Sequence, residues 1–204
     1  MMIRHPLLCF VMLTAGAVCL SVLLSGCNRE HLARYGPFHV TTDSTVWFDG
    51  GMGSRVDRQF NRLLDNHPDV KTITFSDHCP GSNDDESLYV AARRLRQEGI
   101  RTVLNGESVV ESGAVDLFLS GAARQIATGA KIGVHSWSFN WGNDGADLPA
   151  DDPEHEMYLD FYGEMFDDPA LGEEFYWFTL NAASGDDIHY MTAAEIAHFQ
   201  MSTE

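Results

Sequence analysis

The body of the chain alternates short apolar segments with amphipathic ones. Residues 38–49 alternate polar and apolar side chains rich in Val, Thr, Trp and Phe, which predicts a strand. Residues 54–66 carry apolar side chains at helical spacing after a glycine run, which predicts a helix. The same reasoning predicts strands at residues 70–76, 100–104 and 131–136, and helices at residues 84–98 and 112–120. This rhythm indicates an α/β fold with parallel strands and right-handed crossovers.

The pattern changes after Trp141. An acidic loop is expected at residues 143–153, followed by helices at residues 154–166, 171–183 and 191–200. The chain carries 30 acidic against 13 basic residues, a formal charge of -17, and its last basic residue is Lys131. This balance argues against a nucleic-acid partner and against a polybasic membrane patch, because both need a basic surface. Hydrophobic residues make up 44%, which argues against disorder.

The N-terminus has the form of an export signal. A nearly uninterrupted apolar run at residues 7–24 follows Arg4 and ends in small residues. Three interpretations are open: an uncleaved membrane-spanning helix, simple secretion, and a lipoprotein signal. The tetrapeptide Leu24-Ser25-Gly26-Cys27 resembles the bacterial lipobox, which favours the third.

The lipobox divides the chain into three parts. Residues 1–26 would be a removable signal, residues 27–37 a tether beginning with lipidated Cys27, and residues 38–204 one domain. The resemblance implies a bacterial cell-envelope protein on the periplasmic side, and Asn28 weakly favours the outer membrane.

The cysteine and histidine patterns predict neither a disulfide nor a metal site. Cys79 is the single cysteine left after the signal and Cys27 are set aside, and no CxxC pair exists. His155 and His189 lie among acids but lack metal-ligand spacing, so we expect them on a solvated surface. The glycines at residues 50–53 lack the rest of a dinucleotide fingerprint, and no cofactor is expected.

Two residues suggest nucleophilic chemistry. Ser112 opens a predicted helix and is either a simple N-cap or a nucleophile, with the Gly113 N–H as an oxyanion donor. His135 follows a predicted parallel strand, where ligands gather in α/β sheets, and is either a half-buried histidine or a general base. A Ser–Lys dyad that uses Lys131 or Lys71 is an alternative. Gly81 lies in a Pro-Gly turn and could supply a second oxyanion N–H.

Three segments together resemble a known family. They are the Pro80-Gly81 turn after a strand, F-L-x-G-x-x-R at residues 118–124, and G-A-x-x-G-x-H-S at residues 129–136. With Ser112 placed 23 residues before His135, the chain resembles the ClpP/crotonase superfamily, and within it the exported ClpP-like hydrolases. The resemblance implies a spiral of ββα units with parallel strands and C-terminal helices.

The resemblance also implies a site. Ser112 matches the nucleophile, His135 the base, and Gly81 and Gly113 the oxyanion donors. Asp187 lies within one residue of the place expected for the triad acid, and Asp186 is the alternative. The sequence departs from the family where Gly113 follows the serine, in place of Ala or Met, and where Ser82 follows Gly81, in place of a second Gly. Homo-oligomers are common in the superfamily, so self-association is implied as well.

Two functions are compatible with this sequence. The first is a lipid-anchored serine hydrolase, with peptidase activity as one form, that acts on a neutral or cationic acyl or peptide substrate. The acidity of the chain, with 16 acids and no Lys or Arg in residues 143–204, disfavours anionic substrates. The second is a catalytically inactive binding or scaffolding lipoprotein on the same fold.

Overall fold

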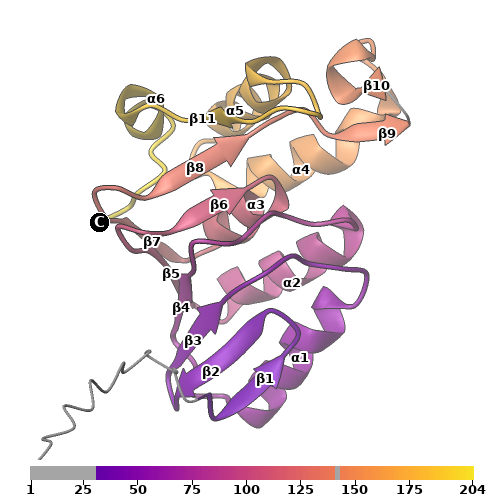
Figure 1. The fold of residues 1–204 in the computed structure, drawn as a ribbon. Coiled ribbons are helices and arrows are strands. Elements are labelled where there is room, and N and C mark those ends of the chain that lie inside the picture. Colours follow the sequence, from indigo (N-terminus) through magenta and orange to yellow (C-terminus); the bar gives the residue numbers. More distant parts are fainter. Residues whose placement is uncertain (1–30, 141–142) are drawn as a thin grey trace, which may run out of the picture.

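The computed structural model describes residues 31–140 and 143–204 (Figure 1). The expected signal, the lipobox-like tetrapeptide and Cys27 lie outside these residues. Within the described residues, no helix is long and apolar enough to cross a membrane.

A six-stranded sheet forms the first layer, with strand order β1-β2-β3-β4-β5-β7. Its strands are β1 (Ala33–Tyr35), β2 (Phe38–Thr42), β3 (Thr45–Phe48), β4 (Thr72–Phe75), β5 (Arg101–Leu104) and β7 (Ala123–Ile126). The four strands from β3 to β7 are parallel, and β1 and β2 join them through antiparallel pairs. The expected α/β organisation with parallel strands is therefore confirmed.

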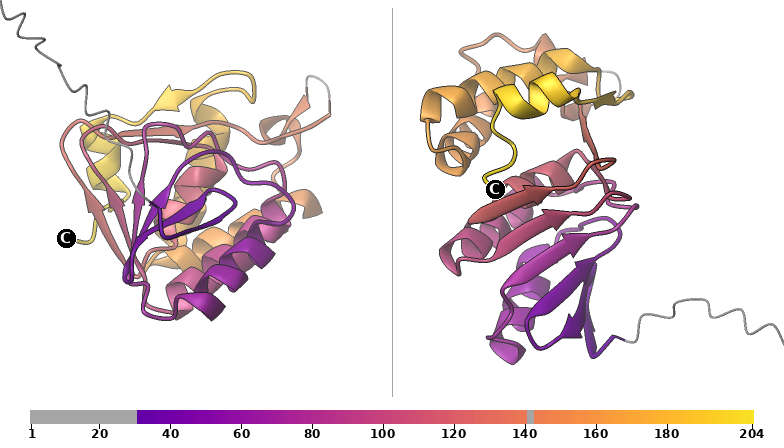
Figure 2. Two further views of the ribbon diagram at one scale, coloured as in Figure 1. Left: turned by 60° about the horizontal axis from the view of Figure 1, so that its bottom comes forward. Right: turned by 90° about the vertical axis from the view of Figure 1, so that its left-hand side faces the viewer.

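Three helices cover one face of this sheet, namely α1 (Val56–Asn66), α2 (Asp85–Gln97) and α3 (Gly113–Leu119). Figures 1 and 2 show α1 and α2 running side by side along that face. The apolar stripe of α1 is buried as its spacing predicts, with Val56, Phe60, Leu63 and Leu64 in the core. Asp84 caps α2 by accepting a hydrogen bond from the backbone N–H of Ser87.

A second, three-stranded sheet positions the candidate site. Its strands are β6 (Val109–Glu111), β8 (Lys131–Val134) and β11 (His189–Tyr190), in the order β11-β8-β6. β6 and β8 are parallel, so their carboxyl ends meet at the same edge. β11 pairs with β8 antiparallel and returns the C-terminal segment to this sheet.

The C-terminal part is helical and rich in aromatic residues. It contains the β9–β10 pair (Ser138–Asn140 and Asn143–Asp144), two short 3₁₀ helices, α4 (Glu156–Met165), α5 (Pro169–Ala182) and α6 (Ala193–His198). Arg124 on β7 secures the chain after α6, because its buried guanidinium donates to the carbonyls of Gln200, Met201 and Leu119. Burial lowers the pKa of Arg124 to about 10.

The structure changes three expectations about the elements. The segment expected as one strand at residues 38–49 is a β2–β3 hairpin, because Asp43 and Ser44 form a turn between two antiparallel strands. Strand β1 lies within residues 27–37, so the segment expected as a tether ends before Ala33. Gly36, at φ +61°, makes the turn from β1 into β2. Residues 105–111, expected as a turn, include strand β6.

Candidate active site

Ser112 and His135 lie next to each other because β6 and β8 are parallel neighbours. Glu111 at the end of β6 is in register with Gly133 on β8, and the N–H of Ser112 donates to the Gly133 carbonyl at 3.0 Å. The residue after β6 and the residue after β8 therefore leave the sheet at one edge. The structure thus brings the predicted nucleophile and the predicted base to one place.

The backbone of Ser112 is strained. Its φ of +54° lies in the left-handed region that favours glycine, and Gln200 is the other non-glycine residue with positive φ among those described. Such backbone costs roughly 1–3 kcal/mol and occurs at functional sites. Ser112 stands at the N-cap of α3, yet its side chain makes no capping hydrogen bond. The helix therefore does not use the hydroxyl, contrary to the simple N-cap interpretation.

Gly81 packs against the serine from the turn that follows β4. A Cβ on Gly81 would lie 2.7 Å from Ser112 Cβ and 3.1 Å from the Gly113 nitrogen. Gly113 is also closely packed, since a Cβ there would lie 2.8 Å from Ser82 Cβ. Within residues 31–140 and 143–204, no hydrogen bond uses the N–H of Gly81 or Gly113. Both N–H groups are therefore without a hydrogen-bond partner in this part of the chain.

The imidazole of His135 is fixed by a backbone carbonyl. Its Nδ1 lies 2.7 Å from the Ser136 oxygen. A carbonyl oxygen only accepts, so Nδ1 carries the proton and Nε2 is left as the acceptor. Ser136 is fully buried and its N–H donates to the Ala183 carbonyl, which holds this carbonyl in place. His135 thus has the tautomer that a general base requires.

A small cavity of about 40 Å³ joins Ser112, Gly113 and His135, and Gly81 lies outside its lining. It is lined by Asp85, Ser112, Gly113, Val115, Asp116, Val134, His135, Trp137, Tyr158, Tyr162, Tyr176 and Thr179. In the described part of the chain, no hydrogen bond joins Ser112 directly to His135. Such contacts are often long in unliganded enzymes and tighten when substrate binds.

Neither Asp187 nor Asp186 forms a hydrogen bond with His135 or lines its cavity. Both are exposed, and the Asp187 carboxylate accepts a hydrogen bond from the N–H of Ile188 within its own loop. The loop is closed by the bond from the Asp187 N–H to the Ser184 carbonyl, and Ile188 packs near Gly133. The Ser136 carbonyl occupies the Nδ1 position that a triad acid would take.

Two carboxylates that the sequence analysis did not select line the cavity. Asp85 is half-buried in the first turn of α2, where an acid also interacts favourably with the helix dipole. Burial raises the pKa of Asp85, and the hydrogen bond from the Tyr158 hydroxyl partly offsets this rise. Asp116 is the single charged residue in the otherwise apolar helix α3, a signal that could have identified it.

Asp116 is a buried carboxylate with a raised pKa. Burial, together with the nearby charge of Asp85, raises its pKa to about 7. The hydroxyl of Tyr162 donates to its Oδ1 at 2.7 Å, and the hydroxyl of Tyr89 donates to its Oδ2 at 3.3 Å. These two bonds favour the charged form and partly offset the burial.

Stacked aromatic rings form another wall of the cavity. Tyr158 lies between Trp137 and Tyr176, with ring centroids 5.0 and 5.6 Å away and planes within 10° of parallel. The indole N–H of Trp137 donates to the Tyr176 oxygen, and the Tyr176 hydroxyl donates to His155 Nδ1. His155 Nε2–H then donates to the Pro149 carbonyl. This chain of bonds fixes the wall.

His155 corrects one expectation from the sequence. It was expected on a solvated acidic surface, but it is 1% exposed and packs against Trp137 and Trp177. Its role is to support the aromatic wall. Within the described residues, no group of His, Cys, Asp and Glu has the arrangement of a metal site.

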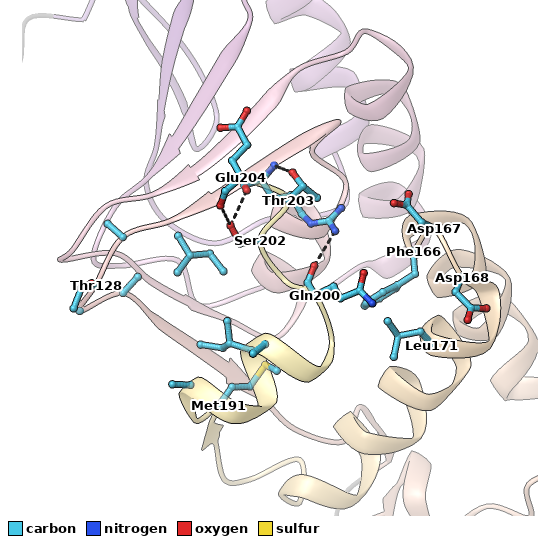
Figure 3. Close-up of a pocket in the computed structure, with 18 residues that line it drawn as sticks. Thr128, Phe166, Asp167, Asp168, Leu171, Met191, Gln200, Ser202, Thr203 and Glu204 are labelled. Carbon is cyan, nitrogen blue, oxygen red and sulfur yellow. Dashed lines mark hydrogen bonds between the residues drawn. The ribbon is translucent and has the colours of Figure 1, made fainter.

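A larger hollow of about 950 Å³ lies away from this site (Figure 3). It runs between the loop around Thr128, the segment Phe166–Leu171, helix α6 and the C-terminal residues, as the figure shows. Neither Ser112 nor His135 lines it. Cys79 is also unsuited to nucleophilic chemistry, because burial raises its pKa to about 11 and keeps it a thiol.

The fold resembles that of solved proteases. A serine-to-alanine mutant of the 1510-N membrane-bound stomatin-specific protease matches with a TM-score of 0.51 and 12% identity, over 78% of this chain and 76% of that chain. A lysine-to-alanine mutant of the same protease, in complex with a substrate peptide, matches with a TM-score of 0.46 and 14% identity, over 78% and 74%. The ClpP-like α/β fold expected from the sequence is thus confirmed as a fold. No protein-family model and no curated protein matches the chain.

Proposed function

We propose that this protein is a serine hydrolase, with a peptide as the favoured substrate. The observation that carries the proposal is Ser112 itself, held at a left-handed φ of +54°, free of helix capping, in a cavity that it shares with His135. The likeness of the fold to a stomatin-specific protease supports the choice of peptidase.

In the proposed reaction, His135 Nε2 takes the proton of the Ser112 hydroxyl as its oxygen attacks the acyl carbonyl. The N–H groups of Gly81 and Gly113 bind the developing oxyanion, and one such donor is typically worth roughly 3 kcal/mol. The Ser136 carbonyl holds Nδ1–H, in the place where a triad carboxylate would stand. The charge of Asp85 stabilises the imidazolium that forms, since these two charges attract.

The test is labelling with a fluorophosphonate, which phosphonylates activated serines. We expect the wild-type chain to be labelled, and we expect Ser112→Ala to lose the label completely while its circular dichroism and melting temperature stay near those of the wild type. His135→Ala should slow labelling by roughly 100-fold or more, the usual size of a general-base effect. Labelling that persists in Ser112→Ala, or no labelling of folded wild-type protein, would refute the proposed hydrolase.

A catalytically silent binding protein on the same fold is the second candidate. The observation that favours it is the missing hydrogen bond between Ser112 and His135 in the described part of the chain. The fluorophosphonate experiment separates the two candidates, because a silent protein would leave Ser112 unlabelled.

We further propose that the chain is exported and anchored in a bacterial envelope membrane through a lipid on Cys27. The support is the sequence Leu24-Ser25-Gly26-Cys27 after the apolar run of residues 7–24. We expect radiolabelled palmitate to be incorporated into the wild-type protein in cells and to be absent from Cys27→Ala. Equal incorporation in both, or none in either, would contradict a lipid anchor at this residue.

A further inference from the structure

The cavity beside Ser112 contains two carboxylates and, among the described residues, no Lys or Arg. Asp85 and Asp116 line it, and the only basic side chain in its lining is His135. Within the described residues, no salt bridge uses either carboxylate. Carboxylates removed from water are normally paired with a cation or a metal, because an uncompensated buried charge is costly.

The chain cannot supply that cation from the opposite wall. Trp137, Tyr158, Tyr162, Tyr176 and Thr179 close this side of the cavity, and all come from residues 132–204, which contain no Lys or Arg. The acidity of the C-terminal part thus has a local consequence, since the described lining of the cavity holds two carboxylates and no Lys or Arg.

The hydrogen bonds of the carboxylates leave room for a further donor. The Tyr158 hydroxyl donates to Asp85 Oδ2 at 3.1 Å, and within residues 31–140 and 143–204 no hydrogen bond reaches Asp85 Oδ1. Asp116 accepts one hydroxyl on each oxygen. A carboxylate oxygen offers about two acceptor sites, so both residues can take hydrogen bonds from an ammonium group.

The size of the cavity limits what can enter it. A volume of about 40 Å³ admits roughly one to three water-sized groups, so a small ammonium group fits between the lining side chains.

We propose that this cavity is a specificity pocket for a short cationic substituent on the acyl part of the substrate, an ammonium group held by Asp85 and Asp116. The proposal rests on the proposed function, because it takes Ser112 as the group that attacks the neighbouring carbonyl. It deepens that function by naming the class of substrate.

The test compares two substrates of nearly equal shape. The substrates are peptide aminomethylcoumarin amides whose last residue is either 2,4-diaminobutyrate or norvaline. The two side chains have the same length, and they end in an ammonium group and a methyl group respectively. We expect the wild type to favour diaminobutyrate by at least about tenfold in kcat/KM, the scale of a charge-assisted contact. Asp85→Asn should reduce this ratio to below about threefold, and Asp116→Asn should lower it in the same direction. Glu86→Gln is the matched control, since Glu86 is exposed on the same turn and outside the cavity, and its ratio should equal that of the wild type.

A binding measurement separates this proposal from the proposed function. In Ser112→Ala, which cannot react, NMR titration should show tighter binding of N-acetyl-diaminobutyrate amide than of N-acetyl-norvaline amide, and Asp85→Asn in that background should remove the difference. This preference without any Ser112 labelling would refute the hydrolase and support the pocket. Equal binding of the two amides, or an unchanged preference in Asp85→Asn, would overturn the cationic pocket even if Ser112 is labelled.

Discussion

Replacing Gly81 by alanine is expected to slow fluorophosphonate labelling of Ser112 by about 100-fold. The new Cβ would lie 2.7 Å from Ser112 Cβ and 3.0 Å from the Glu111 carbonyl oxygen, closer than packed atoms tolerate. Either the serine or the turn must move, and a displacement of about 1 Å at a reacting group can cost about 100-fold in rate. The second-order rate constant of labelling measures the effect.

Gly50→Ala is the matched control for this substitution. Gly50 has a φ of +104°, almost the +105° of Gly81, but nothing lies within 4 Å of a Cβ placed there. Both variants therefore introduce the same backbone strain, roughly 1–3 kcal/mol, and only Gly81→Ala introduces the contact with Ser112. We expect Gly50→Ala to be labelled within about threefold of the wild-type rate. Equal rates for the two variants would show that Gly81 does not position the serine.

The sequence predicts those residues of the site that directly follow a strand. Ser112 and His135 each directly follow a strand of one parallel pair, so parallel pairing is enough to bring them together. The pairing of β6 with β8 was not itself predictable, since residues 105–111 look like a turn and β6 is only three residues long. The pairing of Ser112 with His135 was predicted from the family resemblance and not from the local pattern of strands.

The rest of the site depends on long-range packing. The orientation of His135 comes from the carbonyl of Ser136, and a backbone acceptor leaves no mark in side-chain identity. Asp116 becomes part of the cavity only because Tyr162, 46 residues later, packs over it and donates to it. The resemblance assigned the acid to Asp187 by position along the chain, and the loop that holds Asp187 keeps its carboxylate in local backbone contacts.

The burial of Asp116 predicts an unusual dependence of stability on pH. Its pKa is raised to about 7 in the folded protein, whereas an exposed aspartate titrates near ~3.9 in the unfolded chain. The folded state therefore binds the proton more tightly. The contribution of Asp116 to stability is fully present below about pH 4, declines as the pH rises, and is lost once the pH has passed through about 7.

Asp116→Asn should remove this contribution. The amide oxygen can still accept from Tyr162, and the amide N–H can donate to the Tyr89 oxygen, so the variant keeps the polar contacts without the charge. Between pH 5 and pH 8, the unfolding free energy of the wild type should fall relative to that of Asp116→Asn by about 2–3 kcal/mol. Urea denaturation at the two pH values measures the difference, with the exposed Asp187→Asn as the control for loss of a surface charge. A wild-type-minus-variant difference that stays constant between pH 5 and pH 8 would mean that Asp116 titrates normally, and the cavity would then hold two full negative charges at neutral pH.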